Sequence, residues 1–151
     1  MKISTLTAIL HALNHENVRY LVVGGVAVNL HGYQRLTADL DLVIQLDSEN
    51  IKAALKVFKQ LGYTPSVPIN AEDFIEKQNR DDWVRNKNMT VLQFWSKNYR
   101  DTNIDIFIQE PFEFSHEYKT SEYIDLDKDL RIKLISLESL IKMKERAGRS
   151  K

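Results

Sequence analysis

Two aspartates at alternate positions in an apolar segment are the residues of this sequence best suited to chemistry. Asp39 and Asp41 flank Leu40 and are followed by Leu-Val-Ile. In a β-strand, side chains two positions apart point to the same face, so the two carboxylates would lie side by side. Aspartate is disfavoured in strands and like charges repel, so the pair needs a counter-charge. Mg²⁺ binds one or two carboxylates together with waters and phosphates, which makes it the natural partner. A simpler alternative is that Asp39 only ends a loop while Asp41 pairs with Arg35.

A third carboxylate interrupts another apolar segment. Asp105 lies in Asn103-Ile-Asp-Ile-Phe-Ile, on the strand face opposite the isoleucines. A neighbouring antiparallel strand could place Asp105 beside the first two aspartates. Three converging carboxylates can hold two metal ions, one activating an attacking hydroxyl and the other supporting a triphosphate and its leaving pyrophosphate.

A glycine pair, Gly24-Gly25, separates an apolar segment from a short helical one. Without side chains, glycines let backbone N–H groups approach an anion closely, and a helix N-terminus favours negative charge. The alternative for these residues is a tight turn inside a packed core.

The positions of apolar residues predict the elements that would carry these groups. We expect helices over 3–16 and 26–30, and a helix capped by Ser48 that buries Ile51, Leu55, Phe58 and Leu61 and ends at Gly62. We expect strands over 18–23 and 39–46, a hairpin of 89–95 and 103–109, and an antiparallel pair of 122–126 and 130–134. We also expect a polar helix over 71–79 and a last helix capped by Ser136. Together they predict one domain over residues 1–151, of the α+β class, with a small mixed sheet and flanking helices.

Composition limits the kinds of function that are possible. The chain has 151 residues, 43% of them hydrophobic, and no cysteine. These values predict a folded domain and exclude a disulfide scaffold, a cysteine-ligated zinc site and a thiol nucleophile. No apolar stretch approaches the roughly 20 residues of a membrane span, and the first residues lack the pattern of a secretory signal. We therefore expect a cytoplasmic protein that does not bind a membrane.

The net charge of zero hides an uneven distribution. Residues 101–130 contain nine acidic and two basic residues, whereas residues 131–151 contain seven basic and two acidic ones. The acids suit metal ions, and the bases of the last helix could meet the phosphates that those metals carry. A basic C-terminal segment is also compatible with an RNA-binding module.

Other groupings of polar residues are better explained by structure than by chemistry. Asp125 to Asp129 resembles the start of an EF-hand loop, but Leu130 and Ser136 stand where that loop requires Gly and Glu. His11 and His15 are one helical turn apart without a third ligand. Asp81-Asp82 lies in a charged segment. We expect a solvated turn, surface histidines and a solvated acidic pair.

Three segments resemble the polymerase-β-type nucleotidyltransferase superfamily. They are the strand and glycine turn of residues 20–32, the Arg35-Leu-Thr-Ala-Asp-Leu-Asp41 segment and Asn103-Ile-Asp-Ile-Phe107. Within that superfamily, the Arg-x-Thr-x-Asp-x-Asp form and residues 135–149 are most similar to small bacterial proteins related to AbiEii-type toxins of type IV toxin–antitoxin systems. Residues 63–100 resemble nothing we can name.

This resemblance implies a fold, a reaction and a role for each residue. It implies a palm-like nucleotidyltransferase fold and transfer of a nucleoside monophosphate from an NTP to a hydroxyl, with release of pyrophosphate. Asp39, Asp41 and Asp105 would ligate two Mg²⁺ ions, Asp105 assisting deprotonation of the acceptor. Gly24 and Gly25 would contact the triphosphate, and Arg35 and Lys142 would neutralise its charge. Gly25 stands where many members have serine, and larger members add a substrate domain after the last helix.

The acceptor and the partners stay open. RNA, a protein side chain or a small molecule such as an antibiotic could receive the nucleotide. A protein partner, either an antitoxin or a second subunit, is also compatible with the resemblance. The main alternative is a non-catalytic module that keeps the fold to bind a nucleotide or a partner.

Overall fold

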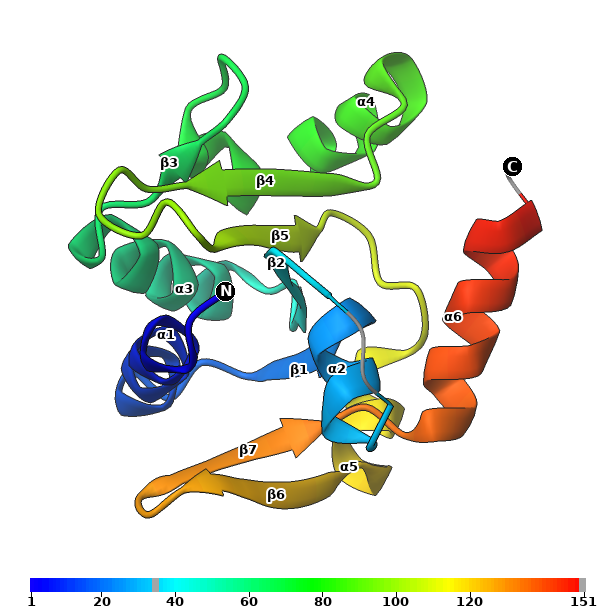
Figure 1. Cartoon of the computed structure of the whole chain (residues 1–151). Coiled ribbons are helices and arrows are strands. Elements are labelled where there is room, and N and C mark those ends of the chain that lie inside the picture. Colours follow the sequence, from blue (N-terminus) through cyan, green and yellow to red (C-terminus); the bar gives the residue numbers. More distant parts are fainter. Residues whose placement is uncertain (34–35, 150–151) are drawn as a thin grey trace.

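A single mixed sheet organises the chain. The computed structural model describes residues 1–33 and 36–149, without the side chains of 148 and 149. Within these residues, seven strands follow one another in the order β3-β4-β5-β2-β1-β7-β6 (Figure 1). Their bounds are Tyr20–Val23 (β1), Asp39–Ile44 (β2), Thr64–Pro65 (β3), Val91–Trp95 (β4), Asn103–Phe107 (β5), Glu122–Asp127 (β6) and Leu130–Leu134 (β7). The expected α+β class with a mixed sheet and flanking helices is confirmed.

Strand directions differ on the two sides of the central strand. β2 is antiparallel to β1 and parallel to β5. The hairpins β4–β5 and β6–β7 are antiparallel, as their sequences predict. The expectation that Asp105 lies on an antiparallel neighbour of the Asp39-Asp41 strand was wrong. The chain leaves β2, passes through α3, β3, η1, α4 and β4, and returns in the direction of β2.

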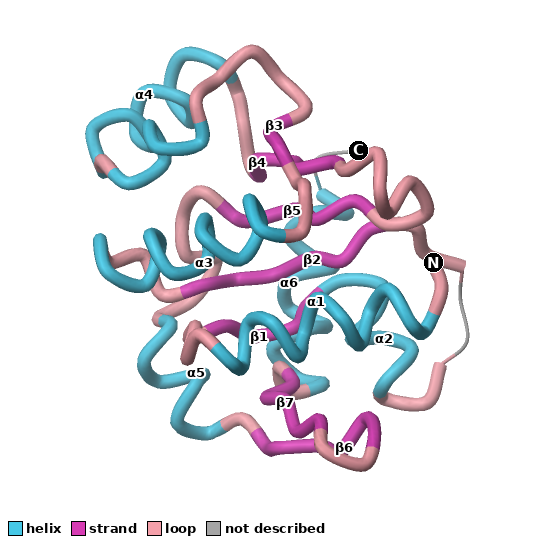
Figure 2. Tube along the Cα trace, turned by 90° about the vertical axis from the view of Figure 1, so that its left-hand side faces the viewer, coloured by secondary structure: helices cyan, strands magenta, loops and turns pink. Residues whose placement is uncertain are grey.

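Helices lie on both sides of the sheet. α1 (Ile3–His15) and α3 (Ser48–Gln60) lie side by side on one side, and α6 (Leu137–Arg149) lies on the other (Figures 1 and 2). The remaining helices are short: α2 (Gly24–Leu30), the 3₁₀ helix η1 (Ala71–Ile75), α4 (Lys77–Lys87) and α5 (Phe114–Thr120). No helix within 1–33 and 36–149 is long and apolar enough to cross a membrane.

Alternation along the central strands separates an apolar face from a polar one. Leu40, Leu42, Ile104 and Ile106 are all buried, and Phe94 of β4 packs on Phe58 of α3 with ring centroids 5.0 Å apart. Burying each such side chain contributes about 1.5 to 3 kcal/mol relative to leaving it in water. The alternate residues of β2 and β5, which include the three aspartates, therefore point away from this core.

Several local features depart from the sequence expectations. The α3 cap is Asp47, whose side chain accepts a hydrogen bond from the Asn50 backbone N–H at 2.9 Å, and not Ser48. α2 begins at Gly24, two residues earlier than expected. The edge strand Thr64–Pro65 and the helix α5 were not expected from the sequence. Ser136 does cap the last helix, since its hydroxyl accepts from the Ser139 N–H at 3.1 Å.

Candidate functional site

The parallel register of β2 and β5 brings two of the three predicted aspartates together. Asp41 lies opposite Asp105, and Asp39 lies opposite Asn103, two residues earlier along both strands. All three aspartates are partly buried. The polar face of the central sheet therefore carries Asp39, Asp41 and Asp105 within two adjacent strands.

The Asp41 and Asp105 carboxyl groups lie close enough for each to affect the pKa of the other. Burial, and then the charge of Asp105, raises the pKa of Asp41 to about 7. Burial also raises the pKa of Asp105, while a hydrogen bond from Gln93 opposes that rise. The charge of Asp39 raises the pKa of both groups. Fully ionised, the three carboxylates would repel one another in a partly desolvated place.

Gly24 and Gly25 lie directly against this pair. Gly24 has φ +67°, in the left-handed region that glycine tolerates, and a Cβ atom there would be 2.0 Å from Asp41 Oδ2. A Cβ on Gly25 would be 2.8 Å from Thr37 Oγ1. The Gly25 backbone N–H donates a hydrogen bond to the Asp41 carboxyl, which opposes the rise of its pKa. Both glycines are therefore required by close packing, and one amide already faces a carboxylate oxygen.

A fourth polar residue completes a row across three strands. Gln93 of β4 lies opposite Asp105, and its Nε2 donates to Asp105 Oδ1 at 3.0 Å. Ser66, just after β3, donates its hydroxyl to Gln93 Oε1 at 3.3 Å. Gln93 was not among the residues predicted from the sequence. The sequence feature that could have indicated Gln93 is its position as a polar residue between Leu92 and Phe94. It lies on the strand that was predicted to form a hairpin with the strand of Asp105.

Solved structures with the same arrangement of elements support the fold. The sequence matches neither a family model nor a curated protein. A candidate nucleotidyltransferase from Thermotoga maritima is 15% identical, with a TM-score of 0.63 over 98% of this chain and 85% of that one. The lincosamide antibiotic adenylyltransferase LnuA, in its lincomycin-bound structure, is 19% identical, with a TM-score of 0.62 over 94% of this chain and 85% of that one. The chain has the nucleotidyltransferase fold.

The structure says less about the two predicted phosphate-binding cations, Arg35 and Lys142, than about the carboxylates. Arg35 lies outside the described residues. Lys142 is exposed on α6, where its Nζ lies 3.5 Å from Glu138 Oε1. α6 contacts α2, the helix that begins with the glycine pair. His31 Nε2 at the end of α2 also lies 2.8 Å from the Ile135 carbonyl just before α6. Lys142 therefore lies on a helix, α6, that packs against α2 behind the glycine turn, while its side chain pairs with Glu138 on the same helix.

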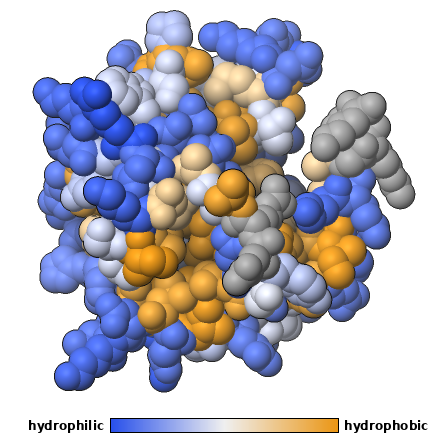
Figure 3. All heavy atoms as spheres, viewed as in Figure 1, coloured by the Kyte–Doolittle hydropathy of each residue, from blue (hydrophilic) through white to orange (hydrophobic). Residues whose placement is uncertain are grey.

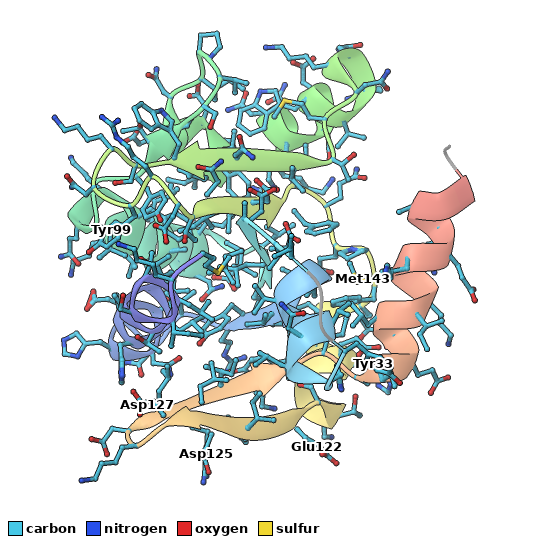
Figure 4. All side chains as sticks on the ribbon, viewed as in Figure 1. Tyr33, Tyr99, Glu122, Asp125, Asp127 and Met143 are labelled. Carbon is cyan, nitrogen blue, oxygen red and sulfur yellow. The ribbon has the colours of Figure 1, made fainter. Side chains whose placement is uncertain are left out.

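The acidic residues of β6 lie apart from the carboxylate pair. Glu122, Asp125 and Asp127 lie on β6, at the edge of the sheet and away from β2 and β5 (Figure 4). Asp125 pairs with Arg131 at 3.0 Å. The expectation that this acidic excess serves metal binding was therefore wrong for β6 of the nucleotidyltransferase fold.

The other groupings behave as structural or surface features. In the Asp125 to Asp129 segment, Asp125 and Asp127 belong to the end of β6, and Lys128 and Asp129 form the turn that leads to β7. His11 and His15 are both exposed. Asp81 pairs with Lys77 at 2.8 Å along α4, and Asp82 is exposed. Each was expected to be solvated rather than to form a site.

An apolar hollow borders the glycine turn. Its volume is about 250 Å³, and it is lined by residues of the N-terminus, α1, α2 and the segment before β2, including Leu6, Val26, Leu30, Leu36 and Thr37. Ile3 and Leu36, which also line it, are largely exposed. Figure 3 shows hydrophobic side chains gathered below the centre of the face that it draws. Thr37 therefore has the glycine turn on one side and an apolar surface on the other.

Within the described ranges, no three or more His, Cys, Asp or Glu side chains are already arranged around a common ion position. Burial raises the pKa of both Asp41 and Asp105 in this arrangement. The donor set still fits Mg²⁺, which prefers carboxylate oxygens and takes only one or two from protein when a phosphate supplies others. A cation would also relieve the repulsion that raises the pKa of both residues.

Proposed function

We propose that this chain is a Mg²⁺-dependent nucleotidyltransferase that transfers a nucleoside monophosphate from an NTP to a hydroxyl acceptor and releases pyrophosphate. The observation that carries the proposal is the register of Asp41 opposite Asp105, with Asp41 packed against Gly24. Four features coincide there: two carboxylates, a third two residues away, a side-chain-free turn and the nucleotidyltransferase fold. A structural salt bridge or a core turn would not require this combination.

Asp39, Asp41 and Asp105 are the residues that would hold Mg²⁺. When bound, Mg²⁺ supplies the positive charge that stabilises a triphosphate and lowers the pKa of a coordinated hydroxyl. The cost of assembling three carboxylates in a partly buried place is consistent with this use, because no described basic side chain is among the groups that shift the pKa of Asp41 or Asp105.

The chain's own groups would bind, orient and accept a proton. The Asp105 carboxylate, held at Oδ1 by Gln93, would accept a proton from an acceptor hydroxyl at its other oxygen. The backbone N–H groups at Gly24 and Gly25 would donate to triphosphate oxygens once the Asp41 carboxylate turns away from them. Arg35 and Lys142 would neutralise phosphate charge, as cations do at such sites.

The acceptor and the biological setting are further parts of the proposal. LnuA is a lincosamide adenylyltransferase, so a small-molecule hydroxyl is one acceptor to test and ATP is the first nucleotide. RNA and a protein side chain are the others. The resemblance to AbiEii-related proteins supports a toxin–antitoxin role with a partner protein, in the cytoplasm.

Transfer can be measured without knowing the acceptor. The protein is incubated with each α-labelled NTP, Mg²⁺ and a cell extract, next to Asp41→Asn, Asp105→Asn and the control Asp129→Asn. Asp129 is an exposed carboxylate on the β6–β7 turn, so the control removes one charge far from the site. We expect label transfer by the wild type and the control, and at least a hundredfold less by the two site variants, as for loss of a group that acts in the transition state.

The binding-only alternative predicts a different result. A non-catalytic module would bind an NTP, measured by calorimetry with Mg²⁺, and would transfer no label to any fraction. Absence of both transfer and Mg²⁺-dependent NTP binding would contradict both functions.

A further inference from the structure

We propose that Gln93 is a positioning residue for the third carboxylate and, through it, for the metal ion. The inference rests on the proposed function and adds a residue that does not itself touch metal or substrate. Gln93 stands opposite Asp105 in the β4–β5 hairpin, so both side chains point to the polar face of the sheet. Its position is set by the backbone ladder and does not depend on a mobile loop.

Ser66 fixes the orientation of the Gln93 side-chain amide, from the side that faces away from Asp105. Ser66 donates its hydroxyl to Gln93 Oε1 at 3.3 Å, and the Ser66 backbone N–H donates to the Gln93 carbonyl at 2.9 Å. With Oε1 occupied as an acceptor, Nε2 is the atom that faces Asp105 Oδ1, at 3.0 Å. The amide therefore presents a donor, and not an acceptor, to the carboxylate.

That donor decides which way the Asp105 carboxylate faces. One oxygen, Oδ1, is held by Gln93 on the β4 side, while Asp41 lies opposite Asp105 on the β2 side, so Asp105 is held between the two neighbouring strands. Without the donor, the χ2 rotation of Asp105 is free, and repulsion from Asp39 and Asp41 favours turning away. Residues that orient metal ligands in this way change metal affinity or activity by about 10- to 100-fold when they are replaced.

The test uses a metal alone, so that it does not depend on an acceptor. Mn²⁺ binding is measured by water-proton relaxation on the wild type, Gln93→Met, Ser66→Ala and Gln45→Met. Methionine keeps the length of glutamine and removes the donor. Gln45 follows the last residue of β2, away from the strand's aspartate end, and accepts from Arg19 at 3.3 Å. The control therefore makes the same chemical change away from the carboxylates.

We expect Gln93→Met to weaken Mn²⁺ binding about tenfold, Ser66→Ala to weaken it about two- to fivefold, and Gln45→Met to leave it unchanged. In a transfer assay, Gln93→Met should raise the Mg²⁺ concentration needed for half-maximal rate by the same factor. Its KM for NTP at saturating Mg²⁺ should change less than twofold. A role only in the stability of β4 would shift the melting temperature and leave both metal measurements unchanged.

Two results would overturn the inference. Equal Mn²⁺ affinity of the wild type and a folded Gln93→Met shows that Asp105 needs no orientation, while the proposed function stands if Asp105→Asn abolishes binding. A wild type that binds no Mn²⁺ removes the inference, and with it the metal-dependent function. Should Gln93→Met fail to fold, Ser66→Ala decides, because Ser66 follows a two-residue edge strand, away from the buried core.

Discussion

Asp41 and Asp105 lie opposite each other on parallel neighbouring strands, where burial raises the pKa of both carboxyl groups. Such a pair is unfavourable for the metal-free fold when both groups are ionised, and useful when a cation lies between them. Stability measurements with and without Mg²⁺ separate these two effects.

Replacing Asp41 should stabilise the metal-free protein at neutral and alkaline pH. The pKa of Asp41 is raised to about 7 in the folded state, chiefly by burial. The folded state therefore binds the proton more tightly than the unfolded chain, and stability is lost as pH rises from about 4 to about 7. We expect Asp41→Asn to be more stable than the wild type by on the order of 2 to 4 kcal/mol at pH 8, and the gain to vanish near pH 4. Urea unfolding at both pH values, with chelator present, measures the difference, and an equal gain at pH 4 would show that ionisation of Asp41 is not its cause.

Mg²⁺ should stabilise the wild type and not the Asp41→Asn variant, and so reverse their order of stability. A ligand that binds only the folded state at ten times its dissociation constant stabilises it by about 1.4 kcal/mol. The melting temperature of the wild type should therefore rise with Mg²⁺ at pH 8 and fall back when EDTA is added. Asp41→Asn and Asp105→Asn should not respond, whereas Asp129→Asn should behave as the wild type. A similar rise in all four proteins would indicate a salt effect.

A methyl group at Gly24 should damage the site more than the same group at Gly32. Both glycines have positive φ, +67° and +100°, but a Cβ on Gly24 meets Asp41, and one on Gly32 meets no described residue within 4 Å. Left-handed backbone costs alanine about 1 to 2 kcal/mol at either position. The contact should add about 1 to 3 kcal/mol at Gly24. Chemical denaturation compares the two variants, and NTP binding should be lost only in Gly24→Ala.

Lys142 offers a test of the basic last helix. Its Nζ lies 3.5 Å from Glu138 on an exposed surface, and such pairs contribute at most about 1 kcal/mol to stability. We expect Lys142→Ala to leave the melting temperature unchanged and to raise the KM for NTP about three- to tenfold, as for loss of one charged hydrogen bond. Lys128→Ala, on the exposed β6–β7 turn, is the control. An unchanged KM would remove Lys142 from the proposed site.

Local sequence was sufficient for the chemical residues and for most elements. The alternation at Asp39, Leu40 and Asp41 predicts a strand with both carboxylates on one face, and the structure has that strand. The same reasoning places Asp105 opposite the buried isoleucines of β5. These signals are strong because burial on one face imposes a period of two.

Features set by distant contacts could not be predicted. The parallel pairing of β2 and β5 depends on the path of the chain between Ile44 and Asn103, which no local pattern reveals. α4 has few apolar residues, and it is held by Trp83 and by the buried Arg80, which donates to the carbonyls of Phe74 and Ile75 at 2.7 and 2.9 Å. Gln93 has meaning only once its cross-strand partner is known.

The central place of β2 in the sheet decides how the site responds to fluctuations. Three strands lie on each side of it, so fraying of β3 or β6 leaves the hydrogen bonds that align Asp41 with Asp105 intact. Hydrogen exchange of the Asp41 and Asp105 amides should therefore approach the rate of global unfolding, while edge amides exchange sooner. The carboxylates that repel one another therefore lie in the part of the molecule that unfolds last, and their spacing stays constant while the edge strands fluctuate.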